Sequence, residues 1–445
     1  PARYARMITR VRYTLFAVYQ RVFSAIFIAN FIALLVLLRN NTDTVKLDTL
    51  ATCASSNLLA SVLVRQDHFI NLLFSIVWLV PWSVPVGIRR SLARVYTYGG
   101  LHTGTAVSGT MWWLVFTALL TLRHNEVDAR DSLVLATTWA VLMLLALVCI
   151  LALPAMRTRY HNTFELSHRL LGWTCVLLFW TQLLIITWNT SRTIGSSFSQ
   201  LLIRQPSFWN LTLLTLLLTY PWLHLRKHTF HPELLSSHAV RLHLTHKVPR
   251  FSCLSISSSP LREWHPFATF PSTSPTHPNA SLIISSAGDW TRNVIHTVGL
   301  SALTHSPPKS LTFYTKGHPH THLLSLTPLF PRVLLVTTGS GIGPCLSSLL
   351  SQPRNQFMRL IWSTRSPEKT YGKEIVDLVR RLEPGAVILD TDVEGRGDLC
   401  GLAWRIYREV EAEAVFVLSN RRQTRTLVRG LGEKGVGVFA PVWDS

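Results

Sequence analysis

Two histidines stand where they could ligate a haem iron. His102 lies near the start of one long apolar segment and His168 near the start of another. If the two segments are parallel helices, both imidazoles lie at the same depth, which is the geometry of bis-histidine haem ligation. A histidine near a helix end can equally contact a neighbouring helix or the membrane interface. Both interpretations stay open, so His102 and His168 are candidate metal ligands or packing residues.

A glycine-rich turn follows a predicted strand in the last third of the chain. The apolar run from Arg332 to Thr338 predicts this strand, and an apolar helix start comes after the turn. Glycines let the backbone approach a pyrophosphate, whose charge the helix N-terminus then stabilises. The residues of this predicted dinucleotide-binding turn are Gly339, Ser340, Gly341, Ile342, Gly343 and Pro344.

A second nucleotide signal follows the next predicted strand, Met358 to Trp362. Arg365 and Lys369 can meet a 2'-phosphate through charge-assisted contacts. Ser363 can donate a hydrogen bond to the same phosphate, and Tyr371 can stack on adenine. The alternative is a solvated helix start that carries ordinary charges.

Long apolar segments must position the two histidines. A membrane-spanning helix needs about 20 mostly apolar residues. A six-span arrangement places most Lys and Arg residues on one side, which the positive-inside rule makes the cytosolic side, together with both chain ends. The stretch 69–85 is also apolar, but its prolines and aromatic residues indicate an interfacial or re-entrant piece. The predicted spans are 14–38, 48–64, 98–121, 132–155, 168–188 and 207–225.

Composition supports a membrane part and argues against two other classes of protein. The chain has 445 residues, 48% of them hydrophobic, and a formal net charge of +20. Residues 1–230 hold 20 Lys and Arg against 7 Asp and Glu, which fits basic loops beside membrane helices better than a nucleic-acid groove. The six cysteines show no regular spacing, and they predict neither a disulfide framework nor a zinc site.

The second half of the chain changes character after Lys227. Short alternating segments broken by Pro, Ser and His predict an antiparallel barrel at 231–330, whereas residues 331–445 alternate strand and helix signals, as a parallel sheet does. His318, His320 and His322 fall in a segment that we interpret as a variable loop. The predicted domains are therefore 1–230 (helical), 231–330 (barrel) and 331–445 (α/β).

Several peptides resemble those of the ferric reductase and NADPH oxidase superfamily. Phe164 to Leu170 looks like the haem-binding signature of its fifth span, with His168 at the first ligand. Glu263 to Thr269 and Gly288 to Thr291 resemble its flavin-binding elements, EWHPFT and GDWT. Gly339 to Pro344 resembles the GTGIAP turn of ferredoxin-NADP reductases, and the segment around Arg365 resembles the NADPH-selecting segment. The resemblance covers almost the whole chain.

This resemblance implies a multi-domain membrane protein. Its fold would be a six-helix ferric-reductase-like transmembrane bundle, followed by an FAD-binding antiparallel β-barrel and an α/β NADP-binding domain. Electrons would pass from NADPH through FAD to an unnamed acceptor, in the plasma membrane or an endomembrane, with membrane lipid around the helices. In the family the first flavin element lines the isoalloxazine and the second supports the phosphates. The residues carried over are His265, Pro266, Phe267, Ala268, Thr269, Gly288, Asp289, Trp290 and Thr291, with Arg396 as a further dinucleotide contact and Trp443 as a shield for the flavin.

Three departures from the family pattern affect the expected function. No plausible ligand for the outer haem stands at the family spacing, so at most one inner haem is expected. The segment Leu282 to Ala287, directly before Gly288, contains no basic residue. Phosphate binding would therefore rest on backbone amides, Thr291 or Arg292. Ser419-Asn420 replaces the usual Cys-Gly pair near the nicotinamide. The alternative is therefore a haem-free regulatory or signalling membrane protein that retains the reductase fold. The positions reached by the outer-haem spacing are Val115, Phe116, Thr181 and Gln182.

Overall fold

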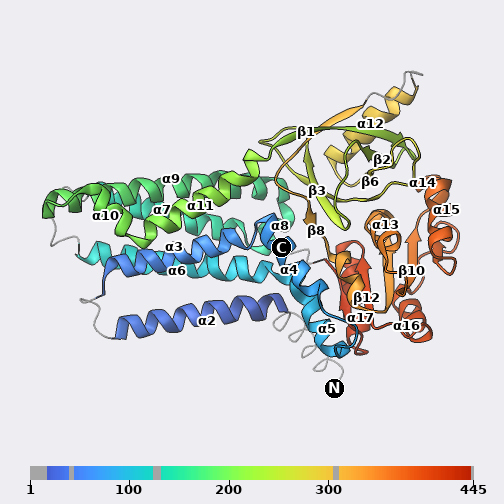
Figure 1. The fold of residues 1–445 in the computed structure, drawn as a ribbon, viewed down its shortest axis with the longest axis horizontal. Coiled ribbons are helices and arrows are strands. Elements are labelled where there is room, and N and C mark those ends of the chain that lie inside the picture. Colours follow the sequence, from blue (N-terminus) through green and yellow to red (C-terminus); the bar gives the residue numbers. More distant parts are fainter. Residues whose placement is uncertain (1–17, 40–44, 124–131, 304–309, 442–445) are drawn as a thin grey trace. The chain divides into compact units, whose positions relative to one another are not determined.

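The computed structural model describes residues 18–39, 45–123, 132–303 and 310–441 and forms two compact units (Figure 1). The described residues of the helical unit are 18–39, 45–69, 97–123 and 132–223. Those of the sheet unit are 70–96, 224–303 and 310–441. A segment from between two helices of the first unit therefore belongs to the second, which the sequence did not suggest.

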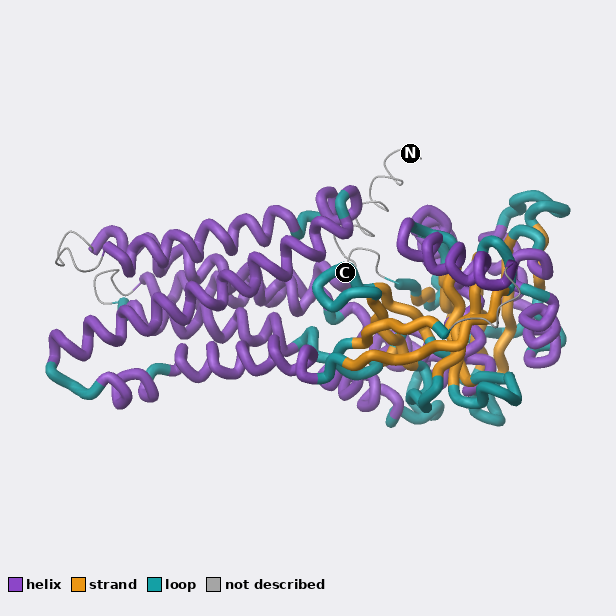
Figure 2. The backbone as a smooth tube through the Cα atoms, turned by 90° about the horizontal axis from the view of Figure 1, so that it is seen from above, coloured by secondary structure: helices purple, strands orange, loops and turns teal. Residues whose placement is uncertain are grey.

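Helices occupy most of the described residues of the six segments that were predicted to span a membrane, and Figure 2 shows the long helices of this unit running alongside one another. Among the described residues, four helices are long and apolar enough to cross a membrane, namely α2, α6, α7 and α9. Helix α3 reaches that length only together with α4 (Asp67–Trp78), across a bend of 68°. The six-span prediction is thus supported for four segments, because α3 has only 17 residues and many polar ones, and α11 contains polar residues together with Pro206 and Pro221. The helices are α2 (Val18–Arg39), α3 (Leu47–Leu63), α6 (Gly99–Arg123), α7 (Ser132–Leu151), α8 (Pro154–Arg159), α9 (His161–Ile194), α10 (Phe198–Arg204) and α11 (Pro206–Leu223).

Glycines on α6 let neighbouring helices approach closely. A Cβ at Gly100 would lie 2.5 Å from the Tyr19 carbonyl oxygen, and one at Gly104 would lie 3.3 Å from the Phe23 carbonyl oxygen. The four-residue spacing of these glycines places them on one face of α6, where small residues permit tight helix pairing. This spacing explains why α2 packs against α6.

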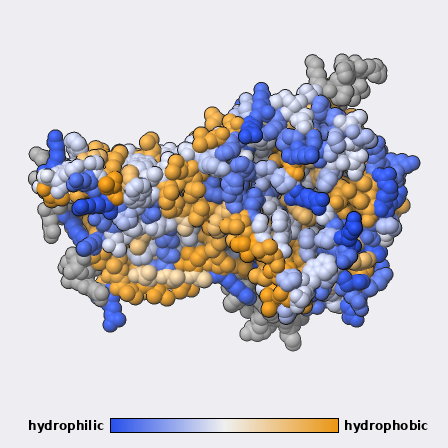
Figure 3. Space-filling view, in the orientation of Figure 1, coloured by the Kyte–Doolittle hydropathy of each residue, from blue (hydrophilic) through white to orange (hydrophobic). Residues whose placement is uncertain are grey.

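The helical unit exposes many large apolar side chains. Apolar side chains gather along its surface in Figure 3. Leu122 is 73% exposed, Met143 65% and Leu177 65%, on three different helices. A helix that is apolar on all sides needs an apolar environment around it. This surface is what a lipid-facing bundle requires.

An antiparallel sheet forms the first part of the sheet unit. Its strands follow the order β4-β3-β7-β1-β2-β6-β5, with β8 pairing with β3. The sheet curls so that β4 also contacts β6, and helix α12 (Asp289–Leu303) packs on β1 and β6. The first strand starts before residue 231, where the predicted barrel begins. The strands are β1 (Arg226–Leu234), β2 (Ala239–Leu244), β3 (Ser252–Ser257), β4 (His265–Ala268), β5 (Phe270–Pro271), β6 (Ala280–Ser285), β7 (Leu311–Thr315) and β8 (His320–Thr321).

A parallel sheet with the order β11-β10-β9-β12-β13 forms the second part. The predicted strand from Arg332 to Thr338 is β9, with the same bounds, at the centre of the sheet. The predicted order of an antiparallel barrel and then an α/β domain is therefore confirmed. The strands are β9 (Arg332–Thr338), β10 (Phe357–Thr364), β11 (Val387–Asp390), β12 (Ala414–Leu418) and β13 (Val438–Phe439). The helices are α13 (Ile342–Ser351), α14 (Pro367–Tyr371), α15 (Lys373–Leu382), α16 (Leu399–Glu409) and α17 (Arg421–Gly432).

The segment 70–96 packs on the sheet unit, where the sequence predicted an interfacial or re-entrant piece at 69–85. The Trp78 indole donates to the Ser325 carbonyl at 2.8 Å, and the Trp82 indole donates to the Pro328 carbonyl at 2.8 Å. Both acceptors lie on the 3-10 helix η5 (Leu323–Leu329). The aromatic residues that suggested a membrane interface therefore bind protein backbone, and α5 (Val86–Leu92) continues the docked segment.

Candidate cofactor-binding site

The two peptides that resemble flavin-binding elements lie side by side in the structure. His265 and Phe267 lie on β4, and Trp290 lies in the first turn of α12. The His265 ring stacks on the Trp290 ring with centroids 4.3 Å apart and an interplanar angle of 24°. The Phe267 ring lies 6.0 Å from the same indole. Sheet pairing and helix docking thus bring together aromatic side chains that are distant in the sequence.

The hydroxyls of Thr269 and Thr291 are used by the protein itself. The Thr291 hydroxyl accepts from the N–H groups of Ala287 and Gly288, each at 2.9 Å. The Thr269 hydroxyl donates to the Ser252 carbonyl at 3.1 Å, and its side chain is buried. Both threonines therefore shape the loops and do not face a cofactor, which corrects their predicted role.

Asp289 and Arg292 form an exposed ion pair at the start of α12. Pairing with a carboxylate reduces the value of Arg292 as a phosphate ligand. The N–H groups in the first turn of an α-helix have no partner within the helix, so they can serve an anion. Phosphate contacts at this end would then come mainly from the backbone.

The glycine turn has the tight geometry that a dinucleotide site needs. Gly339 has φ +54, and its carbonyl accepts from the Trp362 indole at 3.0 Å. A Cβ at Gly341 would lie 2.2 Å from Thr337 Oγ1 and 2.8 Å from the Leu418 carbonyl oxygen. Ser340 is exposed, whereas the Ile342 side chain is fully buried, so a contact of Ile342 with a ligand would come from its backbone.

Two hydroxyls meet where the strand order of the parallel sheet reverses. Thr338 ends β9 and Ser419 follows β12, and their Oγ1 and Oγ atoms lie 2.6 Å apart. Ligands of open α/β sheets bind outside the carboxyl ends of the strands at such a reversal. Ser419, which stands in place of the family cysteine, is therefore fixed at this edge by Thr338. This contact could not be predicted from the sequence.

Arg365 and Lys369 are exposed at the carboxyl end of β10. Between them Ser366 adopts φ 34, a left-handed conformation that is unusual for a residue with a side chain. Its N–H donates to Asp390 at 2.9 Å and its hydroxyl donates to Asp392 at 2.9 Å. These carboxylates at the end of β11 hold the turn that carries Arg365, and sequence reasoning did not identify them.

Tyr371 points inward, contrary to the prediction that it stacks on adenine. Its side chain is 1% exposed and its ring lies 5.4 Å from that of Trp362. Burial raises the pKa of the Tyr371 hydroxyl, while the nearby side chains of Ser285 and Thr364 oppose the shift. The tyrosine thus links the antiparallel and parallel sheets. Of the other predicted contacts, Gly343 and Pro344 lie in the first turn of α13, and Pro266 and Ala268 lie on β4. Ser363 is half-buried, Arg396 is exposed, and Trp443 lies outside the described residues.

His102 and His168 come together in the helical unit. Their ring centroids are 6.3 Å apart. A bis-imidazole iron requires a separation of about 6 to 7 Å, given metal–nitrogen bonds of about 2 Å. His102 Nδ1 donates to the Ser61 carbonyl at 2.9 Å, which leaves Nε2 available as a ligand. His168 Nδ1 is buried and has no hydrogen-bond partner in the part of the chain that the structure describes. The separation of the two rings matches that of a bis-imidazole pair, and the rings meet edge to face with an interplanar angle of 65°.

Comparison with known proteins gives two long matches. Residues 323–445 match the family described as Adenylate-forming reductase 03009, C-terminal domain. Adenylate-forming reductases 03009 and 06235 of Coprinopsis cinerea are each 36% identical to this chain over 99% of its length. The chain spans 41% of the length of each of these relatives. A probable cell surface ferric reductase, kap2 of Aspergillus oryzae, is 24% identical over 55% of this chain and 34% of its own.

Similarity to solved structures is remote. The CS-b5R domains of human Ncb5or match 48% of this chain and 69% of their own, with 11% identity and a TM-score of 0.37. Flavohemoglobin from Malassezia yamatoensis matches 88% of this chain and 98% of its own, with 13% identity and a TM-score of 0.41. The strand order itself gives the sheet unit its ferredoxin reductase-like arrangement of an antiparallel barrel and a parallel α/β domain.

Proposed function

We propose that this protein is a membrane-bound flavoprotein oxidoreductase that takes electrons from NADPH through FAD. One observation carries the proposal: the strand that bears His265 and Phe267 contacts the helix that begins at the glycine turn of the parallel sheet. Helix α13, which starts at that turn, contacts both β4 and β5. The peptides with flavin-binding character and the turn with dinucleotide-binding character therefore lie in the same region of one unit.

The order of the strands assigns a direction to the bound dinucleotide. Arg365 at the end of β10 would bind the 2'-phosphate of the adenosine half. The glycine turn after β9 would hold the pyrophosphate, and the nicotinamide half would then extend over the end of β12, beside Ser419. FAD accepts a hydride from NADPH and can release the electrons singly. His265 and Phe267 would orient the flavin ring against that nicotinamide.

The helical unit would anchor the enzyme in a membrane, with both chain ends cytosolic. Its apolar exterior and four long apolar helices support that location. At most one haem, held by His102 and His168, would accept electrons from the flavin. The plasma membrane and an endomembrane both fit this proposal.

The relatives suggest two classes of electron acceptor. One is a ferric chelate, as the name of the Aspergillus relative indicates. The other is an acyl group activated as an adenylate, as the names of the Coprinopsis relatives indicate. The peptides Gly99-Gly100-Leu101-His102 and Ser363 to Tyr371 also resemble those of the fungal integral membrane protein TmpA. Activity assays with ferric citrate and with an acyl adenylate would separate the two classes.

An absorption spectrum tests the proposal. Protein purified in detergent should show flavin bands that bleach when NADPH is added without oxygen. The double variant His265→Ala/Phe267→Ala should lose most of the flavin, whereas Leu300→Ala, an exposed site on α12, should keep it. Full flavin occupancy in the double variant would overturn the flavin assignment.

A regulatory protein that binds the nucleotides without turnover is the second candidate. The hydrogen bond that ties Ser419 to Thr338 favours it, because this hydroxyl pair occupies the place of the family cysteine. Flavin bands that persist in the presence of bound NADPH would support this candidate over the oxidoreductase.

A further inference from the structure

The outer face of the antiparallel sheet carries charged residues that are not at the surface. Side chains alternate along a strand, so Val240, Leu242 and Leu244 of β2 enter the core while Arg241 and His243 point to the other face. All six residues of β2 are nevertheless buried. Other parts of the sheet unit must therefore cover this polar face and provide partners for its charged side chains.

Sheet register builds a polar network on this face. Glu233 lies directly opposite Arg241, and His231 lies opposite His243. His243 is held from both sides, with Nε2 2.9 Å from Glu233 Oε2 and Nδ1 3.0 Å from Ser281 Oγ. Glu233 thus forms its short hydrogen bond with His243, and its distance to Arg241 is longer.

A cavity of about 760 Å³ lies over this network. Strands β1 and β2 line one side, the loop 273–277 another, and Glu374 and Asp377 of α15 a third. The rings of His231 and His277 stack at its edge with centroids 4.6 Å apart. None of the residues that line it belongs to the flavin or dinucleotide peptides. Its volume falls in the range of small-molecule sites.

Arg241 is poorly satisfied for a buried cation. Its side chain is 3% exposed, yet Nη1 is 3.7 Å from Glu233 and Nη2 is 3.4 Å from Thr273 Oγ1. Its Nε is buried without a hydrogen-bond partner among the described residues. Burial lowers the pKa of Arg241, and Glu233 and Glu374 only partly oppose that shift. Buried charges normally have close partners, and a guanidinium fork matches an oxyanion best.

We propose that this cavity binds a small metabolite through a carboxylate or phosphate group that Arg241 recognises. The stacked imidazoles of His231 and His277 supply further donors at the rim. A metal ion does not explain the cluster, because no group of three or more His, Cys, Asp or Glu in the described residues is arranged to hold one. The site is independent of the proposed redox function.

Binding of citrate and of inorganic phosphate to the purified full-length chain tests the proposal, with calorimetry as the readout. At least one of the two anions should bind. Tighter binding of citrate would identify a carboxylate as the recognised group, and tighter binding of phosphate would identify a phosphate group. Arg241→Gln should weaken that binding roughly tenfold. Glu233→Gln should strengthen it, because the competing carboxylate is lost while the amide oxygen still accepts from His243. An exposed control, Arg405→Gln, should change nothing.

Weaker binding by Arg241→Gln together with stronger binding by Glu233→Gln would indicate a binding site, because loss of folding would weaken binding in both variants. If Arg241→Gln fails to fold, the Glu233→Gln result and a His277→Ala variant, which should weaken binding, still decide the question. Absence of binding by both anions, or binding that neither Arg241→Gln nor Glu233→Gln changes, overturns the proposal. Preferential binding of the diamine putrescine, which the acidic residues of α15 would favour, also overturns it.

Discussion

Arg89 and Glu413 form a forked ion pair that fastens the segment 70–96 to the parallel sheet. Arg89 Nη1 lies 2.5 Å and Nη2 3.2 Å from the two carboxylate oxygens. The Arg89 side chain is 4% exposed, and it also donates to the carbonyls of Leu329 and Val84. Glu413 directly precedes β12, whose other end carries Ser419. The anchored segment therefore contacts the amino end of the strand that helps to form the nucleotide edge.

Glu413→Ala should destabilise the sheet unit by about 3 kcal/mol, because it leaves a buried guanidinium without its carboxylate. For a unit of this size the thermal midpoint should fall by roughly 6 to 12 °C. The measurement is thermal unfolding of the detergent-purified chain, followed by tryptophan fluorescence. Glu409→Ala, an exposed carboxylate on the preceding helix, is the matched control and should leave the midpoint unchanged. Equal midpoints for the two variants would show that the ion pair contributes nothing.

Gly341→Ala should abolish NADPH binding, whereas Gly343→Ala should be tolerated. An alanine Cβ at 341 would meet Thr337 Oγ1 at 2.2 Å and the Leu418 backbone oxygen at 2.8 Å, and the backbone atom cannot move aside. At 343 the nearest atom is Ile283 Cβ at 3.8 Å, an ordinary contact. We expect a loss of affinity of at least roughly tenfold in the first variant only. Titration of NADPH by fluorescence measures both, and similar affinities would contradict the assigned turn.

Arg365→Ala should raise the Michaelis constant for NADPH roughly tenfold and leave that for NADH nearly unchanged, because a charge-assisted contact to the 2'-phosphate is lost. Arg354, exposed in the loop before the same strand, is the control because it lies at the opposite end of β10. Steady-state kinetics with both dinucleotides make the comparison. An equal rise in the Michaelis constant for NADH would show that the substitution disturbs the fold of the loop, and not recognition of the 2'-phosphate.

His322 should make the sheet unit sensitive to acid. Its Nδ1 accepts from the Leu324 N–H at 3.3 Å, and burial, with a smaller contribution from His320, lowers its pKa to about 3. It therefore caps η5 and does not belong to a variable loop, as the sequence had suggested. Below pH 6.5 the unfolded chain binds a proton that the folded chain excludes, so this group should cost about 2 kcal/mol of stability at pH 5.

Thermal midpoints measured between pH 7 and pH 5 test the histidine prediction. His322→Gln should flatten the fall in stability with decreasing pH, whatever its effect at pH 7. His296→Gln, at an exposed position on α12, should leave the slope as in the natural chain. If the slope survives the loss of His322, other groups control the acid response.

Features set by local pattern could be predicted from the sequence. The bounds of β9 follow from a run of apolar residues that ends at glycine, and the flavin peptides were placed together by their resemblance to a known pair. Interactions between distant residues could not be predicted. Nothing near Tyr371 shows that it turns inward to reach Ser285, and nothing near Trp78 shows that its indole binds a carbonyl 247 residues away. The burial of Arg241 could not be predicted, because the loop 273–277 and α15, which line the cavity over its face, are distant from it in the sequence.

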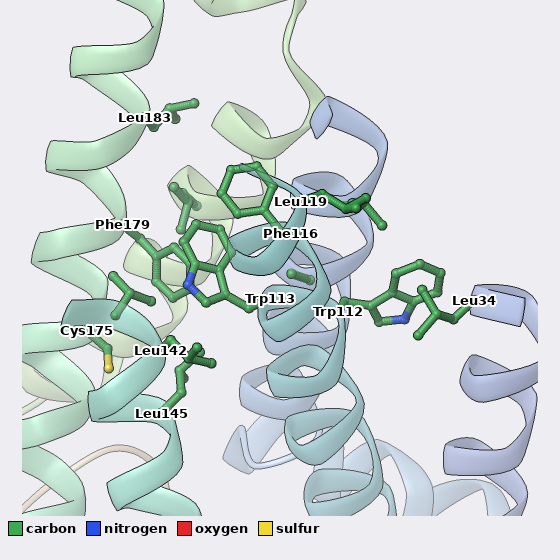
Figure 4. Packing of buried hydrophobic residues seen from close by; sticks show 14 of the residues in the cluster. Leu34, Trp112, Trp113, Phe116, Leu119, Leu142, Leu145, Cys175, Phe179 and Leu183 are labelled. Carbon is green, nitrogen blue, oxygen red and sulfur yellow. The ribbon is translucent and has the colours of Figure 1, made fainter. Parts of the chain in front are cut away.

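The last prediction concerns haem stoichiometry, which should be at most one per chain. Phe116, one of the positions that the outer-haem spacing reaches, belongs to a packed aromatic cluster, in which Trp113 stacks on Phe116 and meets Phe179, each with ring centroids 4.6 Å apart (Figure 4). These large buried rings leave neither ligands nor space for a second macrocycle between α6 and α9. Pyridine haemochrome analysis of the purified protein should therefore give one haem or none, and His168→Ala should remove the one. Two haems per chain would refute the predicted stoichiometry. An unchanged one-haem spectrum in His168→Ala would show that His102 and His168 are not the ligand pair.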